Sequence, residues 1–295
     1  MSAADTAQTP PISCLPDLGR KTLVMGILNV TPDSFSDGGN FDGLETALAH
    51  AEVLIAEGAD IIDIGGESTR PGATAVAADE EIRRIEPIVR AVAARTAIPI
   101  SIDTYKAATA DVALTAGAKI VNDVWGLQRD PDIAAVAAAH GAPVIVMHNR
   151  TEIDGSIDII EDMKAFFARS VEIALKAGIP ERHIILDPGV GFGKTFPQHL
   201  QAVGRLPEIR TLGFPILIGT SRKSLLGILA DHKLEPKDRL YGTIASNVAA
   251  IMLGADIVRV HDVRAHVEAA RVAEAIMKAG LSTSGLTTSG LGGTR

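Results

Sequence analysis

The sequence predicts an α/β fold, a (β/α)8 or TIM barrel in a single domain, from two observations. A helical segment, a glycine and a β-branched apolar strand recur in that order in "EGADIIDI", "AGAKIVND", "HGAPVIVM" and "LGADIVRV". Four further apolar segments, 22–29, 98–103, 183–187 and 215–220, bring the predicted strands to eight. Near-continuous apolar strands that alternate with helices are typical of parallel sheets. Eight such units in about 250 residues match the barrel.

The segments between the strands carry helical signals. Residues 44–58 and 79–97 show the periodicity of amphipathic helices. The glycines that begin the four repeated strands, Gly58, Gly117, Gly141 and Gly254, suit the left-handed position that ends a helix. A doubly wound open sheet is the alternative fold. It would usually have fewer strands and a GxGxxG turn after the first strand, and the sequence has neither feature.

The composition excludes several classes of protein. The chain has 295 residues and is 46% hydrophobic, and its 28 basic and 36 acidic residues give a net charge of −8 without a basic tract for nucleic acid. Cys14 is the single cysteine, so a disulfide within the chain and a cysteine-ligated metal are excluded. No signal peptide or membrane-spanning segment is recognisable, so a cytoplasmic protein is expected. We expect a flexible segment over 1–20, the barrel domain over 21–280 and a disordered tail over 281–295.

Polar residues stand where the predicted strands end. In chain order they are Asn29, the segment "GGESTRPG" (65–72), Asp103, Asn122 and Asp123, His148, Asp187, the segment "SRKS" (221–224), Arg259 and His261. Any one of them could equally cap a helix. Because the C-terminal ends of barrel strands form the active face, their coincidence predicts a site at the barrel mouth.

These residues fall into two chemical groups. Asp103, Asn122 and Asp187 offer acceptors that suit a flat ring with adjacent N–H and NH₂ donors. Lys223, Arg259 and His261 could surround an anion, and for Lys223 and Arg259 this is favoured over an ordinary ion pair. Arg70 could join them or be a solvated loop charge. The sequence therefore predicts a ligand with a donor-rich ring at one end and a phosphate-like group at the other.

Two patterns do not support other functions. The segment "GVGFGKT" (189–195) resembles the phosphate loop GxxxxGK[ST], but three residues rather than four separate Gly189 from Gly193, which indicates an ordinary strand-to-helix loop. The histidines form no HxH or HExxH pattern, which argues against a zinc hydrolase. His50, His199 and His266 lie in helical segments and are expected at the surface.

Seven segments together resemble one enzyme family. They are "GILNVTPDSFSDGG", "DIGGESTRPGA", "SIDTYK", "IVNDVWGL", "LDPGVGFGK", "GTSRKSLLG" and "IVRVHDV", in this order between about residues 22 and 279. The chain is similar over this range to the dihydropteroate synthases. That family has the (β/α)8 fold and joins 6-hydroxymethyl-7,8-dihydropterin diphosphate to 4-aminobenzoate in folate synthesis, forming 7,8-dihydropteroate and diphosphate. The resemblance also implies a homodimer.

The resemblance assigns site residues by motif. It implies a pterin pocket of Asp103, Asn122, Asp187 and Lys223, with Met147 lining the ring pocket. It implies diphosphate contacts from Asn29, Thr69, Arg259 and His261, with Asn29 as the protein ligand of Mg²⁺. The aminobenzoate side corresponds to Phe192, Ser224, Arg70 and Pro71. Asp103, Lys223, Arg259 and His261 are the expected catalytic residues. Asn149 departs from the family pattern, in which a methionine is common.

The implied reaction is a substitution at the pterin methylene carbon, in which the diphosphate leaves and the arylamine attacks. The loop 31–39, with Asp33 and Asp37, is expected to act as a lid over the reacting groups. Three alternatives remain open. A pterin-dependent methyltransferase would not need the diphosphate cluster, and a Schiff-base aldolase would use Lys223 as its nucleophile. A non-catalytic pterin-binding protein would bind the diphosphate without releasing it.

Overall fold

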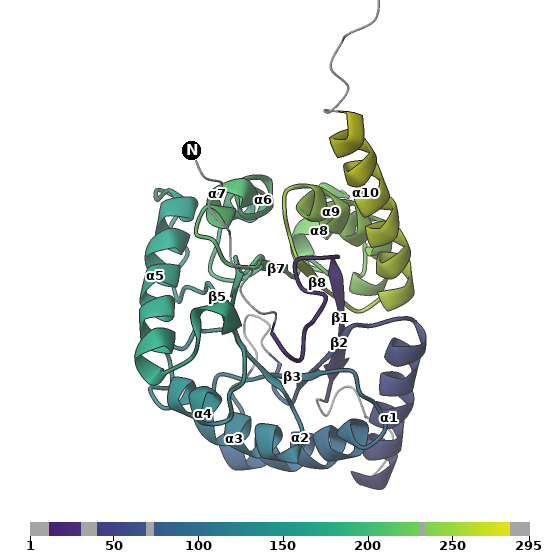
Figure 1. Ribbon diagram of the computed structural model, residues 1–295, viewed down its shortest axis with the longest axis vertical. Coiled ribbons are helices and arrows are strands. Elements are labelled where there is room, and N and C mark those ends of the chain that lie inside the picture. The colour runs from purple at the N-terminus through teal and green to yellow at the C-terminus, as the bar shows by residue number, and fades with distance from the viewer. Residues whose placement is uncertain (1–11, 31–39, 69–73, 231–233, 284–295) are drawn as a thin grey trace, which may run out of the picture.

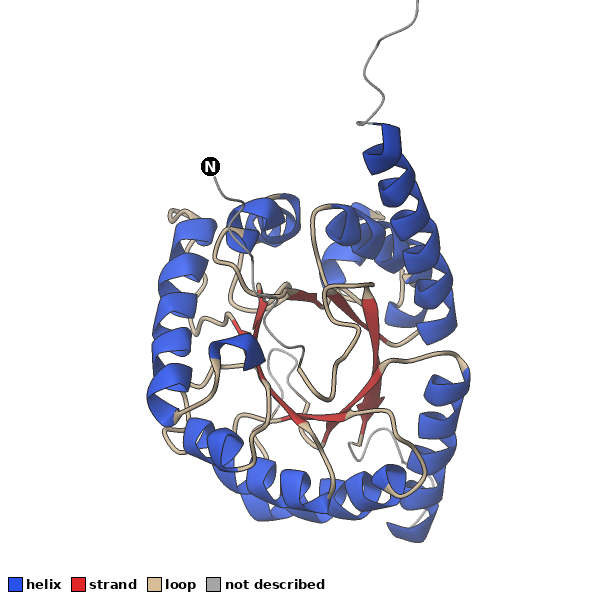
Figure 2. Cartoon of the chain, in the orientation of Figure 1, coloured by secondary structure: helices blue, strands red, loops and turns tan. Residues whose placement is uncertain are grey.

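The computed structural model describes residues 12–30, 40–68, 74–230 and 234–283. Its parallel strands pair in the order β6-β5-β4-β3-β2-β1-β8-β7. Figures 1 and 2 show the strands arranged around a central axis. They are β1 (Leu23–Asn29), β2 (Ile61–Gly65), β3 (Ile100–Asp103), β4 (Ile120–Asp123), β5 (Val144–Met147), β6 (Ile184–Asp187), β7 (Leu217–Ile218) and β8 (Ile257–Val260). A bridge between Leu186 and Ile216 joins β6 to the segment before β7. The predicted (β/α)8 barrel is confirmed.

Helices form the outer ring of the barrel (Figure 2). They are α1 (Asn40–Ala56), α2 (Ala78–Ala93), α3 (Ala107–Ala116), α4 (Ile133–Ala139), α5 (Ile159–Ala177), α6 (Phe196–Gly204), α7 (Leu206–Arg210), α8 (Ser224–Leu229), α9 (Leu240–Met252) and α10 (Val263–Thr283), with short 3₁₀ helices at Glu181–His183 and Pro236–Asp238. The glycine after α3, Gly117, has a φ of 125°, and a Cβ there would lie 2.6 Å from that of Ala93. The predicted helix-ending role of this glycine is therefore confirmed.

The strands alternate between two hydrophobic environments. On β2, Ile62 and Ile64 face the helices, whereas Ile61 points into the barrel with Met25 and Ile120. Ile12 and Leu15, from the segment before β1, join this inner cluster and are nearly fully buried. Figure 1 shows this purple segment crossing the barrel. Apolar side chains thus fill the N-terminal half of the barrel, and the polar residues at the strand ends lie in the C-terminal half.

Part of the predicted organisation lies outside the described residues. This applies to residues 1–11 and 284–295, and to the loop 31–39 with Asp33 and Asp37. Within the described chain, no helix combines the length and apolar character needed to cross a membrane.

Candidate active site

The strand register brings the predicted polar residues to one rim of the barrel. Asn29 of β1 lies beside Gly65 of β2, which lies beside Asp103 of β3, and Asp103 lies beside Asn122 of β4. On the other side of the barrel, Met147 of β5 lies beside Asp187 of β6. The signal in the sequence was the change from apolar to polar residues at each strand end. Because the strands are parallel and paired in this register, these polar residues lie at the same height along the barrel axis.

Arg259 of β8 lies between two buried carboxylates. Its Nε donates to Oδ2 of Asp63 at 2.6 Å, and its Nη2 donates to Oδ2 of Asp103 at 2.7 Å. Asn122 Nδ2 donates to the same Asp63 oxygen at 3.2 Å. Arg259 thus forms ion pairs with the inward-facing Asp63 and Asp103, which both need a cation in this enclosed space. The binding role that the sequence favoured for Arg259 stays a prediction.

Asp63 was missed by the sequence analysis. It lies within the apolar strand β2 and is fully buried, so it resembled an interruption of core rather than a site residue. The two-residue period of a strand could have found it, because Asp63 shares the inward direction of Ile61 and Gly65. It anchors both Arg259 and Asn122.

The charges in this cluster influence one another strongly. Burial raises the pKa of Asp103 to about 7; Arg259 opposes the rise, and the nearby carboxylate of Asp63 adds to it. Burial acts to lower the pKa of Arg259, but attraction to Asp63 and Asp103 outweighs it and raises that pKa above its usual value. Asp103 Oδ1 is buried and has no hydrogen-bond partner among the described residues. That oxygen is therefore an acceptor available to a ligand.

Asp187 and Lys223 form a second corner of the mouth. Gly189 N–H donates to Asp187 Oδ1 at 2.8 Å, and burial raises the pKa of Asp187. Lys223 precedes α8 and donates to the Val190 carbonyl, with Nζ 4.5 Å from the centre of the Phe192 ring. Burial lowers the pKa of Lys223 to about 8, and the charge of Asp187 opposes this change. Ser224 begins α8 and is exposed.

The predicted histidines take different positions. Nδ1 of His261 lies 2.9 Å from Ser221 Oγ, and the residue is one of those that line a pocket of about 380 Å³ between α1 and α10. His148 is fully buried behind the mouth, where Nε2 contacts Asp162 Oδ2 at 2.9 Å. The surface prediction for His266 is wrong: it is 1% exposed, because α10 turns it inward, where Nδ1 bonds to the Asp262 carbonyl.

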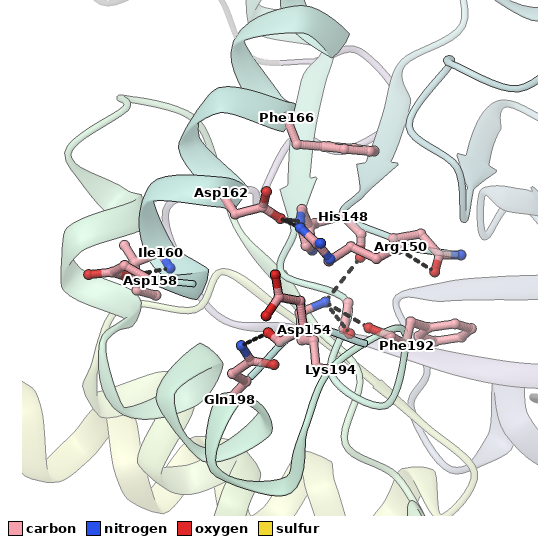
Figure 3. A network of polar contacts seen from close by, with 12 residues as sticks. His148, Arg150, Asp154, Asp158, Ile160, Asp162, Phe166, Phe192, Lys194 and Gln198 are labelled. Atoms are coloured by element: carbon pink, nitrogen blue, oxygen red, sulfur yellow. Dashed lines mark hydrogen bonds and ion pairs between the residues drawn. The ribbon is translucent and has the colours of Figure 1, made fainter. Parts of the chain in front are cut away.

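The loops after β5 and β6 complete this side of the mouth (Figure 3). Asn149 Nδ2 donates to the Val124 carbonyl at 3.0 Å, so the residue that departs from the family pattern ties the loops after β4 and β5 together. The segment 189–195 is a strand-to-helix loop between β6 and α6, as predicted. It contains Lys194, a buried lysine whose importance the sequence did not signal.

Two predicted sets remain untested by this geometry. Thr69, Arg70 and Pro71 lie outside the described residues. Within the described part of the chain, no group of three or more His, Cys, Asp and Glu side chains is arranged to hold a metal ion. Asn29, the predicted metal ligand, is exposed at the rim and offers a single amide oxygen.

Comparisons with known proteins agree with this architecture. The model of the pterin binding enzyme family matches residues 25–261. The dihydropteroate synthase of Bacillus subtilis (strain 168) is 52% identical over 243 residues, which are 82% of this chain and 84% of that protein. That of Synechocystis sp. is 50% identical over 253 residues, which are 84% of this chain and 87% of that protein.

Solved structures give the same result. A crystal structure of dihydropteroate synthase from Clostridium difficile, in the presence of pteroic acid, has a TM-score of 0.86 and 52% identity, and the match covers 88% of this chain and 98% of that chain. The Xanthomonas albilineans dihydropteroate synthase with 4-aminobenzoic acid has a TM-score of 0.86 and 41% identity, with 91% and 98% of the two chains covered.

Proposed function

The chain belongs to the dihydropteroate synthase family of pterin binding enzymes, and on this premise we propose which of its residues bind each part of the two substrates. It is a transferase of folate synthesis that condenses 6-hydroxymethyl-7,8-dihydropterin diphosphate with 4-aminobenzoate, forming 7,8-dihydropteroate and diphosphate. A relative from Xanthomonas albilineans has been solved in complex with 7,8-dihydropteroate.

The pterin ring would bind to Asp103, Asn122, Asp187 and Lys223, with Met147 against the ring. The observation that carries this assignment is the set of buried acceptors at the mouth, above all Asp103 Oδ1, which is buried without a described partner. A buried acceptor of this kind is costly unless a ligand donor satisfies it. Asp187 has one oxygen engaged by Gly189 N–H, and its other oxygen can accept from the ring.

The diphosphate would bind to Arg259, His261 and Thr69. Arg259 uses Nε and one Nη2 hydrogen for its two carboxylates, so three of its five donors remain for phosphate oxygens. The Asp63 contact also holds the guanidinium in a fixed orientation, which lowers the entropy cost of binding the anion.

Asn29 would hold Mg²⁺. A single protein oxygen at the exposed rim fits a metal whose other ligands are diphosphate oxygens and water, the arrangement usual for this ion. When bound there, Mg²⁺ supplies positive charge that stabilises the leaving diphosphate.

The aminobenzoate would bind beside Phe192, Ser224, Arg70 and Pro71. Phe192 and Lys223 lie together, so the arylamine would enter next to the pterin methylene. As diphosphate leaves, Arg259 and His261 meet the developing negative charge, while Asp103 and the acceptors around the pterin stabilise the positive charge of its ring. The arylamine nitrogen forms the C–N bond as the C–O bond to diphosphate breaks, and the resulting secondary ammonium releases one proton to solvent water.

The residue assignments are tested by incubation with pterin diphosphate, 4-aminobenzoate and Mg²⁺, followed by mass detection of dihydropteroate. Variants Asp103→Asn and Arg259→Met should form little product, and omission of Mg²⁺ should slow the reaction. Full activity of either variant would remove that residue from the site. Full activity with a chelator would remove the metal assignment.

A homodimer is also proposed, through α9 and α10. On α9, Tyr241, Ala245 and Met252 are exposed at helical spacing, and Tyr241 is 85% exposed. On the neighbouring α10, Val272 and Ile276 are exposed one turn apart. We take these side chains together as one apolar surface, because contiguous exposed apolar patches mark protein–protein interaction sites. The domain limits 21–280 and a cytoplasmic location stay predictions.

A further inference from the structure

Lys194 is a buried cation in the loop between β6 and α6. The residue is only 3% exposed to solvent. Its Nζ donates to the carbonyl oxygens of Gly189 at 2.9 Å, Phe192 at 3.0 Å and His148 at 3.3 Å. An ammonium group has three N–H donors, so all of them are used on main-chain carbonyls.

Burial of the Lys194 ammonium group costs free energy, because the charge is removed from water. Among the described residues, the hydrogen-bond partners of Nζ are carbonyl oxygens and not carboxylates, although Asp187 and Asp162 attract its charge from further away. Burial lowers the pKa of Lys194 to about 7, and Lys223 and Arg150 repel its charge. A buried charge whose direct partners are all main-chain carbonyls costs free energy that packing with an apolar side chain would avoid. The lysine is therefore better explained by what it holds in place.

Lys194 holds the loop against the end of β5. Two of its three carbonyls belong to the loop itself, and the third belongs to His148 at the end of β5. The two segments approach closely: a Cβ on Gly193 would lie 2.4 Å from the Arg150 carbonyl oxygen. Figure 3 shows the Lys194 ammonium between His148 and the main chain of Phe192. A second tie follows at α6, where Gln198 Nε2 donates to the Asp154 carbonyl at 2.7 Å.

The loop carries Phe192 into the mouth. Its main-chain carbonyl accepts from Lys194, and its ring lies below Lys223. Residues 188–194 lie outside regular secondary structure, and within this loop the Phe192 N–H donates to the Gly189 carbonyl at 3.1 Å. The Lys194 ammonium adds a bond to the Phe192 carbonyl and ties the loop to the carbonyl of His148 at the end of β5. By contrast, Asp103, Asn122 and Asp187 are strand residues and are held by the barrel ladder.

We propose that Lys194 is a positioning residue for the second substrate: its ammonium group fixes the loop 188–193 so that Phe192 is in place for the aminobenzoate ring. The inference rests on the proposed assignment of Phe192 to the aminobenzoate side. It adds a residue that does not itself contact either substrate.

The test compares two binding steps in Lys194→Met and Lys194→Gln. Loss of the charged donor should raise the KM for 4-aminobenzoate about tenfold, while the Kd for pterin diphosphate stays within about twofold. The matched control is Lys176→Met, an exposed lysine on α5, which should change neither value. Equal losses of affinity for both substrates, or loss of cooperative unfolding in both Lys194 variants, would assign Lys194 to stability alone and overturn the inference.

A double-mutant cycle with Phe192→Leu separates the inference from the assignment beneath it. If Lys194 acts through Phe192, the two substitutions remove the same interaction. The double variant Lys194→Met/Phe192→Leu should then have nearly the same KM for aminobenzoate as the single variant with the higher KM. If the increase in KM of the double variant equals the product of the increases in the two single variants, the inference is overturned and the Phe192 assignment stays intact. An unchanged KM in Phe192→Leu alone would remove the assignment, and the inference with it.

Discussion

At the residue scale, Arg259 both neutralises buried carboxylates and presents donors to the mouth. Asp63 is fully buried and its carboxylate accepts from Arg259 and Asn122. The guanidinium therefore stabilises the protein before any substrate arrives. A substitution at this position changes stability and anion binding together, and the two effects have to be measured apart.

Arg259→Met should destabilise the fold by about 3 kcal/mol, because removing one partner leaves a buried carboxylate uncompensated. Urea unfolding at neutral pH measures this loss. Adding Asp63→Asn should restore part of the stability, because the amide carries no charge, but should not restore binding of the diphosphate. Arg90→Met, which removes an exposed ion pair on α2, is the control and should change stability little. Unchanged stability in Arg259→Met would contradict the proposed balance of charges.

Asp187→Asn should weaken pterin binding at least about tenfold while leaving the protein folded, because an amide donor would face the donors of the ring. Burial raises the pKa of Asp187, so its charged form is disfavoured, and the neutral amide should leave the protein folded. Calorimetric titration with the pterin diphosphate gives the affinity, with the exposed Glu172→Gln as the control. Wild-type affinity in Asp187→Asn would exclude it from the pterin pocket.

His148 makes stability depend on pH. Burial lowers its pKa from 6.5 to about 3, and Lys194 adds to this effect. The unfolded chain takes up this proton below its ordinary pKa, whereas the folded protein excludes it until about pH 3. Stability is therefore lost as the pH falls through 6.5, by about 2 kcal/mol between pH 8 and pH 5 from this residue.

His148→Gln should remove that part of the pH dependence, since glutamine cannot titrate and keeps an N–H donor for Asp162. Urea unfolding at pH 8 and pH 5 gives the difference for each protein. The slope that remains is the sum of two opposed contributions. Burial lowers the pKa of His199 to about 4, which costs stability as the pH falls, and burial raises the pKa of Asp103 to about 7, which adds stability as the pH falls. The same slope in the variant and the wild type would show that His148 is not the titrating group.

At the scale of the elements, local patterns were enough to predict where the strands lie, but not the exact length of each strand or which face of a helix is buried. The recurring glycine and β-branched run located β2, β4, β5 and β8, because each depends only on neighbouring residues. The strand β7 is shorter than the predicted 215–220, since Pro215 has no N–H for the ladder and only Leu217–Ile218 pair as a strand. His266 was misplaced because the helical pattern alone did not show which face of α10 packs inward.

At the scale of the whole molecule, the candidate site depends on contacts that no local pattern contains. Asp63 and Arg259 are separated by 196 residues and meet only because β1 pairs with both β2 and β8. The strand ends could be placed at one rim from the fold class, since parallel strands share a direction. The partner of each charge could not, because that requires the inward direction of every side chain around the barrel.

In the proposed dimer, the exposed apolar side chains of α9 and α10 are buried against the second chain. Tyr241→Glu/Met252→Glu places two charges in the exposed apolar stripe of α9, where burial against a second chain would leave them unpaired. Light scattering should then give the 30.8 kDa mass of one chain, whereas the wild type should give twice that mass. Leu175→Glu, on the exposed side of α5, is the matched control and should keep the wild-type mass. The active-site residues lie on strands and loops at the barrel mouth, so the variant should still bind pterin diphosphate. A wild-type protein with the mass of one chain would refute the dimer, and an unchanged twofold mass in the variant would place the interface elsewhere.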